Sequence, residues 1–297
     1  MMMKAHAKIN VGLRIGGVRA DGFHEIWSIL QEIELCDEIT LREAPDLLLS
    51  VSGGPPDLPA DENNLCLKAA RLLKAEFKLQ RGAHIHLQKK VPMGAGLGGG
   101  SSDAAAVLKG LNLLWNLGLE VEELLRLSAQ LGSDVPFFVL GGSCVAQGRG
   151  ERLTPITPLI QDPLLLLTPG IAISTAWAYK NITNYSLTQG WQNINLVDLK
   201  KEAFSEILPN DFEPLVFKHH PVLWALKDQL RRAGAYYASL SGSGSSLYGV
   251  FHSEENAHRA CESIQMEGQK YLLNRREAAN SGRRVSASPS GGSDGDH

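Results

Sequence analysis

At 297 residues the chain is long enough for two medium-sized domains, and a composition of 43% hydrophobic and 21% charged residues is ordinary for a soluble globular protein. A formal net charge of −3 provides no electrostatic attraction for nucleic acid or for an anionic membrane, which argues against both as partners.

The four cysteines are widely separated and include no C-x-x-C pair, which indicates neither a zinc site nor a disulfide framework; they are Cys36, Cys66, Cys144 and Cys261. The N-terminus has no apolar segment of signal-peptide length, and no apolar run reaches the length that spans a bilayer. We therefore expect a cytoplasmic protein whose partners must be inferred from its sites, as a monomer or a homodimer.

The first predicted element is a half-buried strand over residues 4–15, where apolar and polar side chains alternate. Lys8 and Asn10 lie two residues apart on its polar face, which is either a solvated face or a pair of side chains that point together into a cleft. A turn follows at Asp21-Gly22. Judged alone, Phe23 is a core anchor and His24 a surface residue.

Three strands are predicted next, over residues 28–35, 37–42 and 47–51, before a proline-rich turn at 53–59. A helix begins near residues 63–64, because apolar residues then recur at helical spacing. The Asn64 side chain either caps this helix or contacts a ligand. In the strand over 83–88, His84 and His86 share one side without a carboxylate or cysteine nearby, so no metal site is predicted there.

The glycine-rich stretch Val91–Ala105 cannot form an ordinary helix or strand, and it leads into a helical pattern. Glycines let the backbone approach an anion, and the free N–H groups that begin the next helix attract negative charge, so we predict a phosphate-binding loop. The hydroxyls of Ser101 and Ser102 can cap that helix, bond a phosphate oxygen or contact a magnesium ion. A Walker loop is excluded, because no lysine precedes the serines.

Other phosphate loops remain as interpretations of this stretch. The dinucleotide fingerprint G-x-G-x-x-G is satisfied by Gly94, Gly96 and Gly99 and predicts an oxidoreductase that binds NAD(P)H. The pattern Pro-x-x-x-Gly-Leu-Gly-x-x-Ser-Ser is matched by residues 92–102, and this run resembles the phosphate loop of the GHMP kinases, the superfamily of galactokinase and the homoserine, mevalonate and phosphomevalonate kinases. A purely structural glycine-rich turn is the plainest alternative.

After the loop, helices are predicted over residues 102–114 and 121–131. Asp134 then lies between a glycine turn and the apolar run Val135–Phe138. It either caps a short helix or forms the floor of a dry active site, and the pattern favours neither. Repeated glycines and prolines place a domain boundary at residues 152–163.

The second half of the chain alternates predicted strands, at residues 164–167, 236–240 and 247–251, with predicted helices, at residues 197–206, 221–233 and 254–267. A second Gly/Ser loop, Ser241–Ser246, joins two of these strands. It is either a flexible connection or a set of N–H donors for an anion. The Ser/Gly/Asp-rich end cannot form a core, so we expect a disordered tail over 277–297.

Five motifs together resemble one family of GHMP kinases, the 4-diphosphocytidyl-2-C-methyl-D-erythritol kinases of non-mevalonate isoprenoid biosynthesis; they are Ala7–Asn10, Arg19–His24, Pro92–Ala105, Gly132–Phe138 and Ser241–Gly244. The glycine loop indicates only the superfamily, whereas the Asp21–His24 turn and the Gly132–Phe138 segment select this family. The resemblance implies a two-lobed α+β fold with the active site between the lobes. It implies an N-terminal domain over 1–152 with a left-handed βαβ unit, and a ferredoxin-like C-terminal domain over 160–276.

The resemblance also implies a reaction, the phosphorylation of the 2-hydroxyl of the methylerythritol moiety by ATP with Mg²⁺. Asp134 matches the catalytic aspartate that takes or orients the hydroxyl proton, and Lys8 matches the lysine that keeps this carboxylate ionised and stabilises the transferring phosphoryl group. No protein ligand of the metal is implied.

Binding residues follow from the same resemblance. ATP-binding residues would be Asn64, near adenine, and the loop Pro92, Met93, Gly94, Ala95, Gly96, Leu97, Gly98, Gly99, Gly100, Ser101 and Ser102. Substrate-binding residues would be His24, which hydrogen-bonds the cytosine, Phe23 and Tyr179, which sandwich it, Asn10, Thr175 and Lys180 in the channel, and Ser241, Gly242, Ser243 and Gly244 over the phosphates.

Two positions depart from the family pattern, because His6 replaces a usual proline and Phe23 replaces a common tyrosine, which removes a hydroxyl but keeps the stacking surface. Three alternatives stay open. They are another GHMP kinase of the homoserine or mevalonate type, the dinucleotide-binding oxidoreductase, and an inactive nucleotide-binding module, which the presence of both Lys8 and Asp134 disfavours.

Overall fold

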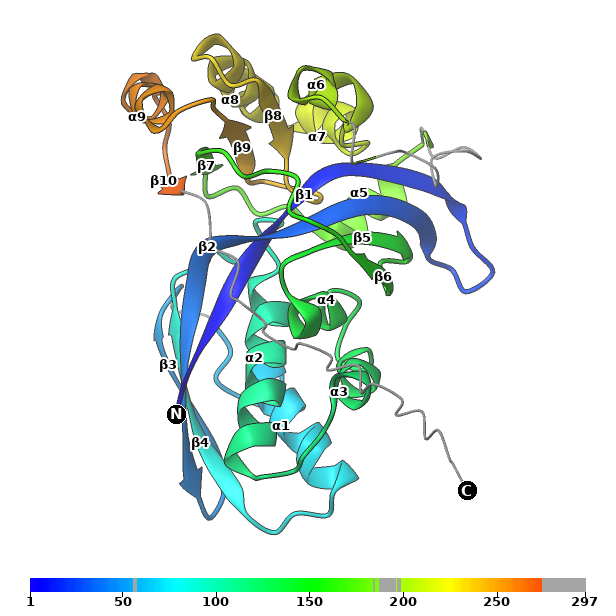
Figure 1. Cartoon of the computed structure of the whole chain (residues 1–297), viewed down its shortest axis with the longest axis vertical. Coiled ribbons are helices and arrows are strands. Elements are labelled where there is room, and N and C mark those ends of the chain that lie inside the picture. The colour runs from blue at the N-terminus through cyan, green and yellow to red at the C-terminus, as the bar shows by residue number, and fades with distance from the viewer. Residues whose placement is uncertain (56–57, 184, 187–195, 197–198, 274–297) are drawn as a thin grey trace, which may run out of the picture.

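A long antiparallel hairpin runs between the two lobes of the protein (Figure 1). The computed structural model describes residues 1–55, 58–183, 185–186, 196 and 199–273. The hairpin consists of β1 (Met2–Val18) and β2 (His24–Ala44). The prediction of two strands over 28–35 and 37–42 is wrong, because Cys36 pairs with His6 and Asp37 pairs with Ala5, so β2 continues through the expected break.

The N-terminal lobe contains a six-stranded sheet in which β2 is central. One edge of β2 pairs with β1, and the other is shared by β4 (Gly82–Lys89) and β5 (Ser143–Gly148). β3 (Leu47–Gly53) runs parallel to β4 and is connected to it through α1 (Leu65–Glu76), which makes a βαβ unit, and β6 (Arg152–Pro155) pairs with β5. Among the strands described, β3 and β4 are the only parallel pair, so the doubly wound sheet of a dinucleotide-binding domain is not formed.

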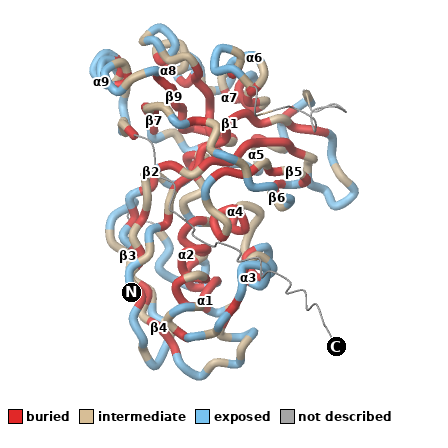
Figure 2. The backbone as a smooth tube through the Cα atoms, viewed as in Figure 1, coloured by how far each residue is buried: buried red, intermediate tan, exposed pale blue. Residues whose placement is uncertain are grey.

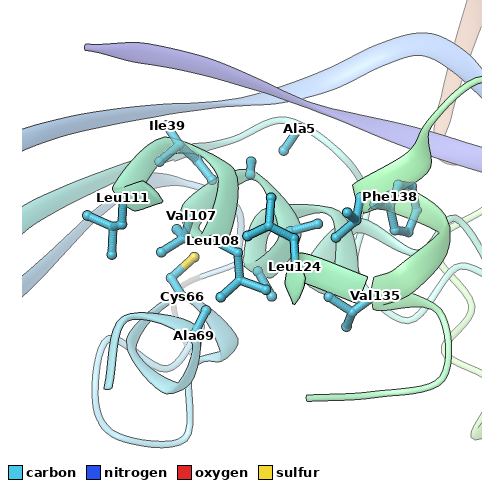
Figure 3. Packing of buried hydrophobic residues seen from close by; sticks show 14 of the residues in the cluster. Ala5, Ile39, Cys66, Ala69, Val107, Leu108, Leu111, Leu124, Val135 and Phe138 are labelled. Carbon is cyan, nitrogen blue, oxygen red and sulfur yellow. The ribbon is translucent and has the colours of Figure 1, made fainter. Parts of the chain in front are cut away.

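Helix α2 (Gly99–Leu114) is the centre of the N-lobe core. Figure 3 shows its Val107, Leu108 and Leu111 facing α1, while side chains of α3 (Val121–Ser128) and α4 (Val135–Leu140) close the cluster. α2 begins three residues before the predicted start, because Gly98, at φ 69°, acts as the N-cap and Gly99 and Gly100 are already helical. α3 ends three residues before its predicted end, because residues 129–131 form a turn.

The C-terminal lobe has the β-α-β-β-α-β order of a ferredoxin-like fold. Its four antiparallel strands lie in the order β10-β7-β9-β8, with bounds β7 (Leu164–Thr168), β8 (Tyr237–Leu240), β9 (Leu247–Val250) and β10 (Gln269–Leu273). Two helices, α8 (Pro221–Arg232) and α9 (Glu254–Ser263), follow β7 and β9 and share a core with the sheet. The expected ferredoxin-like architecture is therefore confirmed.

Several C-lobe predictions need correction. The helix expected over 197–206 is reduced to a 3₁₀ turn (Lys201–Ala203) and α6 (Phe204–Ile207), because Lys200 is extended; residues 197 and 198 lie outside the described chain. α9 ends four residues early, because Ile264 is extended and the chain turns at Gly268 into β10, which was not predicted. α5 (Thr175–Asn181) and α7 (Glu213–His219) were also not predicted. The tail prediction over 277–297 falls outside the described residues.

A shared apolar cluster joins the two lobes along β1. Ile9 and Val11 of β1 are fully buried with Leu166 of β7 and Tyr248 of β9. Figure 2 shows these three strands as buried where the lobes meet. Full burial of such a side chain contributes about 1.5–3 kcal/mol. The Tyr248 hydroxyl also donates to the Asn10 carbonyl at 2.7 Å. β1 is thus fixed at the lobe junction, which positions its polar side chains there. No helix in the described part of the chain is long and apolar enough to cross a membrane.

Candidate active site

A cavity of about 800 Å³ lies where the two lobes meet β1. Its wall includes twenty of the residues named from the sequence, namely Lys8, Asn10, Phe23, His24, Asn64, Pro92, Met93, Gly94, Ala95, Gly96, Leu97, Gly98, Gly99, Gly100, Ser101, Asp134, Thr175, Tyr179, Gly242 and Ser243. Four other named residues, all of them described, are not part of this wall: Ser102, Lys180, Ser241 and Gly244. Segments far apart in the sequence therefore share one cavity.

The glycine loop forms one end of the cavity. Gly94, Gly96 and Gly98 have φ angles of 62°, 77° and 69°, a region that side chains other than glycine rarely adopt. A Cβ atom on Gly96 would lie 2.0 Å from the carbonyl oxygen of Ser241, so the loop fits only without one. Gly98 has no side chain to cap α2, which leaves the first N–H groups of the helix available to an anion.

The second Gly/Ser loop is packed against the first. The Ser241 hydroxyl donates to the Gly96 carbonyl at 2.9 Å, and the Ser246 N–H donates to the Ala95 carbonyl at 3.1 Å. Both serines are fully buried. The interpretation as a flexible connection is therefore wrong. The loop also reaches α5, because the hydroxyls of Ser243 and Thr175 are hydrogen-bonded at 3.0 Å.

Lys8 is buried at the centre of the cavity wall, so the solvated-face interpretation of this strand position is wrong. Its Nζ donates to Asn10 Oδ1 at 2.6 Å, Asn10 Nδ2 donates to the Ser28 hydroxyl at 2.9 Å, and that hydroxyl donates to the Gly12 carbonyl at 2.7 Å. Burial lowers the pKa of the Lys8 ammonium, and the charge of Asp134 opposes this effect. The hydrogen-bond chain holds the ammonium in one orientation.

Asp134 faces Lys8 from the start of α4. It stands at the N-cap position, but its side chain makes no capping hydrogen bond, so the cap interpretation is wrong. Its Oδ2 lies 4.0 Å from Lys8 Nζ, and its side chain is 41% exposed, against 6% for Lys8. At this distance the two charges attract without a close hydrogen bond, so the carboxylate can still accept a proton from a third group.

Aromatic side chains form the other end of the cavity. The His24 ring stacks on Tyr179 at 5.5 Å between centroids, and its other ring neighbour, Tyr185, is also at 5.5 Å. His24 Nδ1 lies 3.0 Å from the Gly16 carbonyl, which can only accept, so Nδ1 carries the hydrogen and Nε2 of the neutral ring is an acceptor. Phe23 is 48% exposed and is not the core anchor that the isolated pattern favoured.

Asn64 caps α1 and also lines the cavity. Its Oδ1 accepts from the Cys66 N–H at 2.9 Å, and its Nδ2 donates to the Pro59 carbonyl at 2.7 Å. The capping prediction is confirmed. Because both ends of the amide already have protein partners, a ligand at this wall would meet a side chain that is held in place.

Sequence reasoning missed several residues at this site, of which five are charged or aromatic. Lys89, Asp103, Arg149 and Phe212 belong to the cavity wall, and Tyr185 packs on His24. Arg149 places its guanidinium 5.1 Å above the Phe23 ring, a cation–π contact. The Gly148-Arg149-Gly150 run was the available signal for Arg149, but no function was assigned to it from the sequence. The other four have no local pattern that separates them from ordinary core or surface residues.

The donor set for a metal is sparse. Within the described ranges, no group of three or more His, Cys, Asp or Glu side chains gathers as metal ligands. The cavity wall does contain two carboxylates, Asp134 and Asp103, and the hydroxyl of Ser101, with Ser102 next to it in the loop. Mg²⁺ in phosphoryl-transfer sites commonly binds through one or two carboxylates and the substrate phosphates, so these residues fit an ion that arrives with a nucleotide.

Comparisons with known proteins agree with this geometry. The family model "GHMP kinases N terminal domain" matches residues 64–142, and "GHMP kinases C terminal" matches residues 194–269. Proteins named 4-diphosphocytidyl-2-C-methyl-D-erythritol kinase are similar to the chain: one from Prosthecochloris aestuarii is 40% identical, with 88% of this chain and 93% of the relative covered. A second relative of that name, from Chlorobium chlorochromatii, is 44% identical, and the match covers 89% of this chain and 93% of the relative.

Solved structures of GHMP kinases are also similar to this chain. A crystal structure of 4-(cytidine 5'-diphospho)-2C-methyl-D-erythritol kinase superposes with a TM-score of 0.77 at 31% identity, covering 92% of this chain and 98% of that one. The mevalonate kinase of Methanococcus jannaschii reaches a TM-score of 0.70 at 17% identity over 93% and 98% of the two chains, which shows the shared fold alone. The kinase identity of the relatives removes the oxidoreductase alternative. The chain belongs to the 4-diphosphocytidyl-2-C-methyl-D-erythritol kinase family of the GHMP kinases.

Proposed function

We propose that the chain transfers the γ-phosphoryl group of ATP to the 2-hydroxyl of 4-diphosphocytidyl-2-C-methyl-D-erythritol, a step of non-mevalonate isoprenoid biosynthesis. The observation that carries this proposal is that one cavity contains a glycine phosphate loop, the Lys8–Asp134 pair and an aromatic end. The proposal includes a cytoplasmic location, a monomeric or homodimeric state, and a division into domains at 1–152 and 160–276.

ATP would bind at the glycine-loop end. The N–H groups that begin α2 are oriented for phosphate oxygens, and the positive end of the helix dipole favours their negative charge. The wall beyond the loop contains Leu58 and Leu65, an apolar surface of the kind that accepts a purine ring, and the Asn64 amide lies in the same wall. Mg²⁺ bound to the phosphates there would neutralise part of their charge.

Asp134 and Lys8 would act on the acceptor hydroxyl. As the hydroxyl oxygen forms its bond to the γ-phosphorus and the bond to ADP breaks, Asp134 would accept the hydroxyl proton. The Lys8 ammonium would keep Asp134 ionised and stabilise charge on the transferring group. The support for these roles is the burial of Lys8, its fixed orientation, and the 4.0 Å separation that leaves the Asp134 oxygens accessible.

The cytidine group would bind at the aromatic end, with Asn10, Thr175, Lys180 and the Ser241–Gly244 loop along the path to the phosphates. With a hydrogen on Nδ1, the uncharged form of His24 would accept at Nε2 from the exocyclic amino group of cytosine. Phe23 and Tyr179 provide stacking faces, and a base between them would displace Arg149 from Phe23 or His24 from Tyr179.

The test is ADP release in a coupled assay with Mg-ATP and one acceptor at a time. We expect turnover with 4-diphosphocytidyl-2-C-methylerythritol and none with mevalonate or homoserine, because neither has a base for the aromatic end. Turnover with mevalonate or homoserine, together with none of the cytidyl substrate, would contradict the proposal and retain only the GHMP fold.

A further inference from the structure

Three ionisable side chains are buried together below the glycine loop. Lys89, at the end of β4, has 3% of its side chain exposed, Asp37 of β2 has none, and Asp103 of α2 has 4%. Lys89 Nζ donates to Asp37 Oδ2 at 2.5 Å and to Asp103 Oδ2 at 2.8 Å. Buried charges are rare and costly, so a cluster of three needs a reason beyond stability.

The cluster connects both ends of the glycine loop. At the start of the loop, Asp37 Oδ1 accepts from the N–H groups of Lys90 at 2.5 Å and Val91 at 2.8 Å. At its end, Asp103 lies in the first turns of α2. Lys89 bridges the two carboxylates. The chain between Lys90 and Gly98 is therefore attached at both ends to one ammonium group.

The ammonium also occupies the space at the start of α2. A Cβ atom on Gly99 would lie 2.8 Å from Lys89 Nζ, so the lysine fills the room that a side chain would need. Lys89 and Asp103 both belong to the cavity wall.

Among the described residues, Asp103 Oδ1 has no hydrogen-bond partner although it is buried. An unpaired carboxylate oxygen at a cavity wall is more typical of functional sites than of a packed core.

We propose that Asp37, Lys89 and Asp103 are positioning residues that set the distance between the start of the glycine loop and the N-terminus of α2, and so fix the phosphate-binding N–H groups for ATP. This inference rests on the proposed function, because it concerns the ATP end of the same cavity. The three residues act through the loop backbone and do not touch the reacting atoms.

The energetics of the cluster agree with this role. Burial lowers the pKa of Lys89, but the two carboxylates outweigh it and leave that pKa raised, so the bridge stays charged. Burial raises the pKa of Asp103 to about 7 despite the nearby ammonium. The other groups that face Asp103 are Asp37 of β2 and the Cys66 thiol of α1. Two carboxyl groups share one ammonium in the interior, an arrangement that simple packing would not require.

The test compares Asp103→Asn with Glu38→Gln. Glu38 pairs with Lys90 at 2.6 Å and is one residue from Asp37, but this pair is partly exposed, so its variant makes the same charge change outside the cluster. Binding of a fluorescent ATP analogue to the full chain is measured without acceptor, followed by KM for each substrate. We expect Asp103→Asn to weaken ATP binding by about 10- to 100-fold with KM for the cytidyl substrate unchanged, as for a displaced positioning group, and Glu38→Gln to match wild type.

A second variant tests the proposal in case Asp103→Asn does not fold. Lys89→Met combined with Asp37→Asn and Asp103→Asn replaces all three members of the cluster with neutral side chains, and neutral replacement of a whole buried cluster is tolerated better than loss of one partner. The same loss of ATP affinity is expected from it. Wild-type affinity in either folded variant overturns the proposal, since a merely structural cluster would lower Tm alone. Wild-type protein that binds ATP but does not phosphorylate the cytidyl substrate would contradict the proposed function, and the binding comparison would still decide the role of the cluster.

Discussion

The two ends of the cavity are built in different ways. At the glycine-loop end, backbone groups are held by buried contacts, such as the Ser241 hydroxyl on the Gly96 carbonyl and the Asp37 carboxylate on the Val91 N–H. At the aromatic end the surface is formed by side chains, and Phe23 is 48% exposed with the Arg149 guanidinium above its ring. Phosphoryl transfer depends on alignment of the reacting atoms, whereas stacking of a base tolerates small shifts. The difference predicts that substitutions at the two ends affect different kinetic constants.

The largest effect is expected between the two ends, at Asp134. Asp134→Asn keeps the shape of the side chain but removes the proton acceptor, so kcat should fall by about 10²- to 10⁴-fold, with both KM values near wild type. Steady-state kinetics would measure this. Asp228→Asn is the control, because that carboxylate pairs with Arg232 on the surface of α8. A variant at Asp134 with wild-type kcat would remove its proposed catalytic role.

Gly96→Ala should weaken ATP binding selectively. Its Cβ would lie 2.0 Å from the Ser241 carbonyl oxygen, and the left-handed backbone adds about 1–2 kcal/mol of strain for alanine, so KM for ATP should rise and Tm should fall.

Gly94→Ala provides the matched control, because Gly94 also has a positive φ but nothing lies within 4 Å of its Cβ position. It carries the backbone strain without the clash. Equal KM values for ATP in the two variants would mean that contact between the two loops does not control nucleotide binding.

His24→Ala should weaken binding of the cytidyl substrate selectively. Loss of the ring removes an acceptor and a stacking partner of Tyr179, so KM for the cytidyl substrate should rise by about 10- to 100-fold while KM for ATP stays the same. His24→Phe separates the two contributions, because it keeps the ring but lacks Nε2. An unchanged KM for the cytidyl substrate in His24→Ala would place the base elsewhere.

The smallest effect is expected from Phe23→Tyr. The substitution adds the hydroxyl that is common in the family, and the exposed ring leaves room for it, so KM for the cytidyl substrate should fall by the equivalent of about 0.5–1.5 kcal/mol, one hydrogen bond. Isothermal titration with CDP would measure the change in affinity directly. Weaker binding of CDP would show that the ring edge is already occupied.

The sequence predicted the site better where local chemistry was distinctive. The glycine loop was found because its run of glycines leaves a local pattern, and strict alternation singled out Lys8 and Asn10, whose roles then came from the family resemblance. The Asp37–Lys89–Asp103 cluster was missed, because it forms between residues 52 and 14 positions apart and each looks like an ordinary surface charge. Tertiary pairing likewise made β2 one strand and created β10, whose partner β7 lies far away in the chain.

The most direct test of the account is ³¹P NMR of the reaction products formed from Mg-ATP and 4-diphosphocytidyl-2-C-methylerythritol by wild type and by Asp134→Asn. We predict that wild type produces ADP and one new phosphomonoester resonance without three-bond proton coupling, because carbon 2 of the methylerythritol moiety has no proton, and that the variant produces almost none. A phosphomonoester formed equally by both proteins, or ATP left intact by folded wild type, would contradict it.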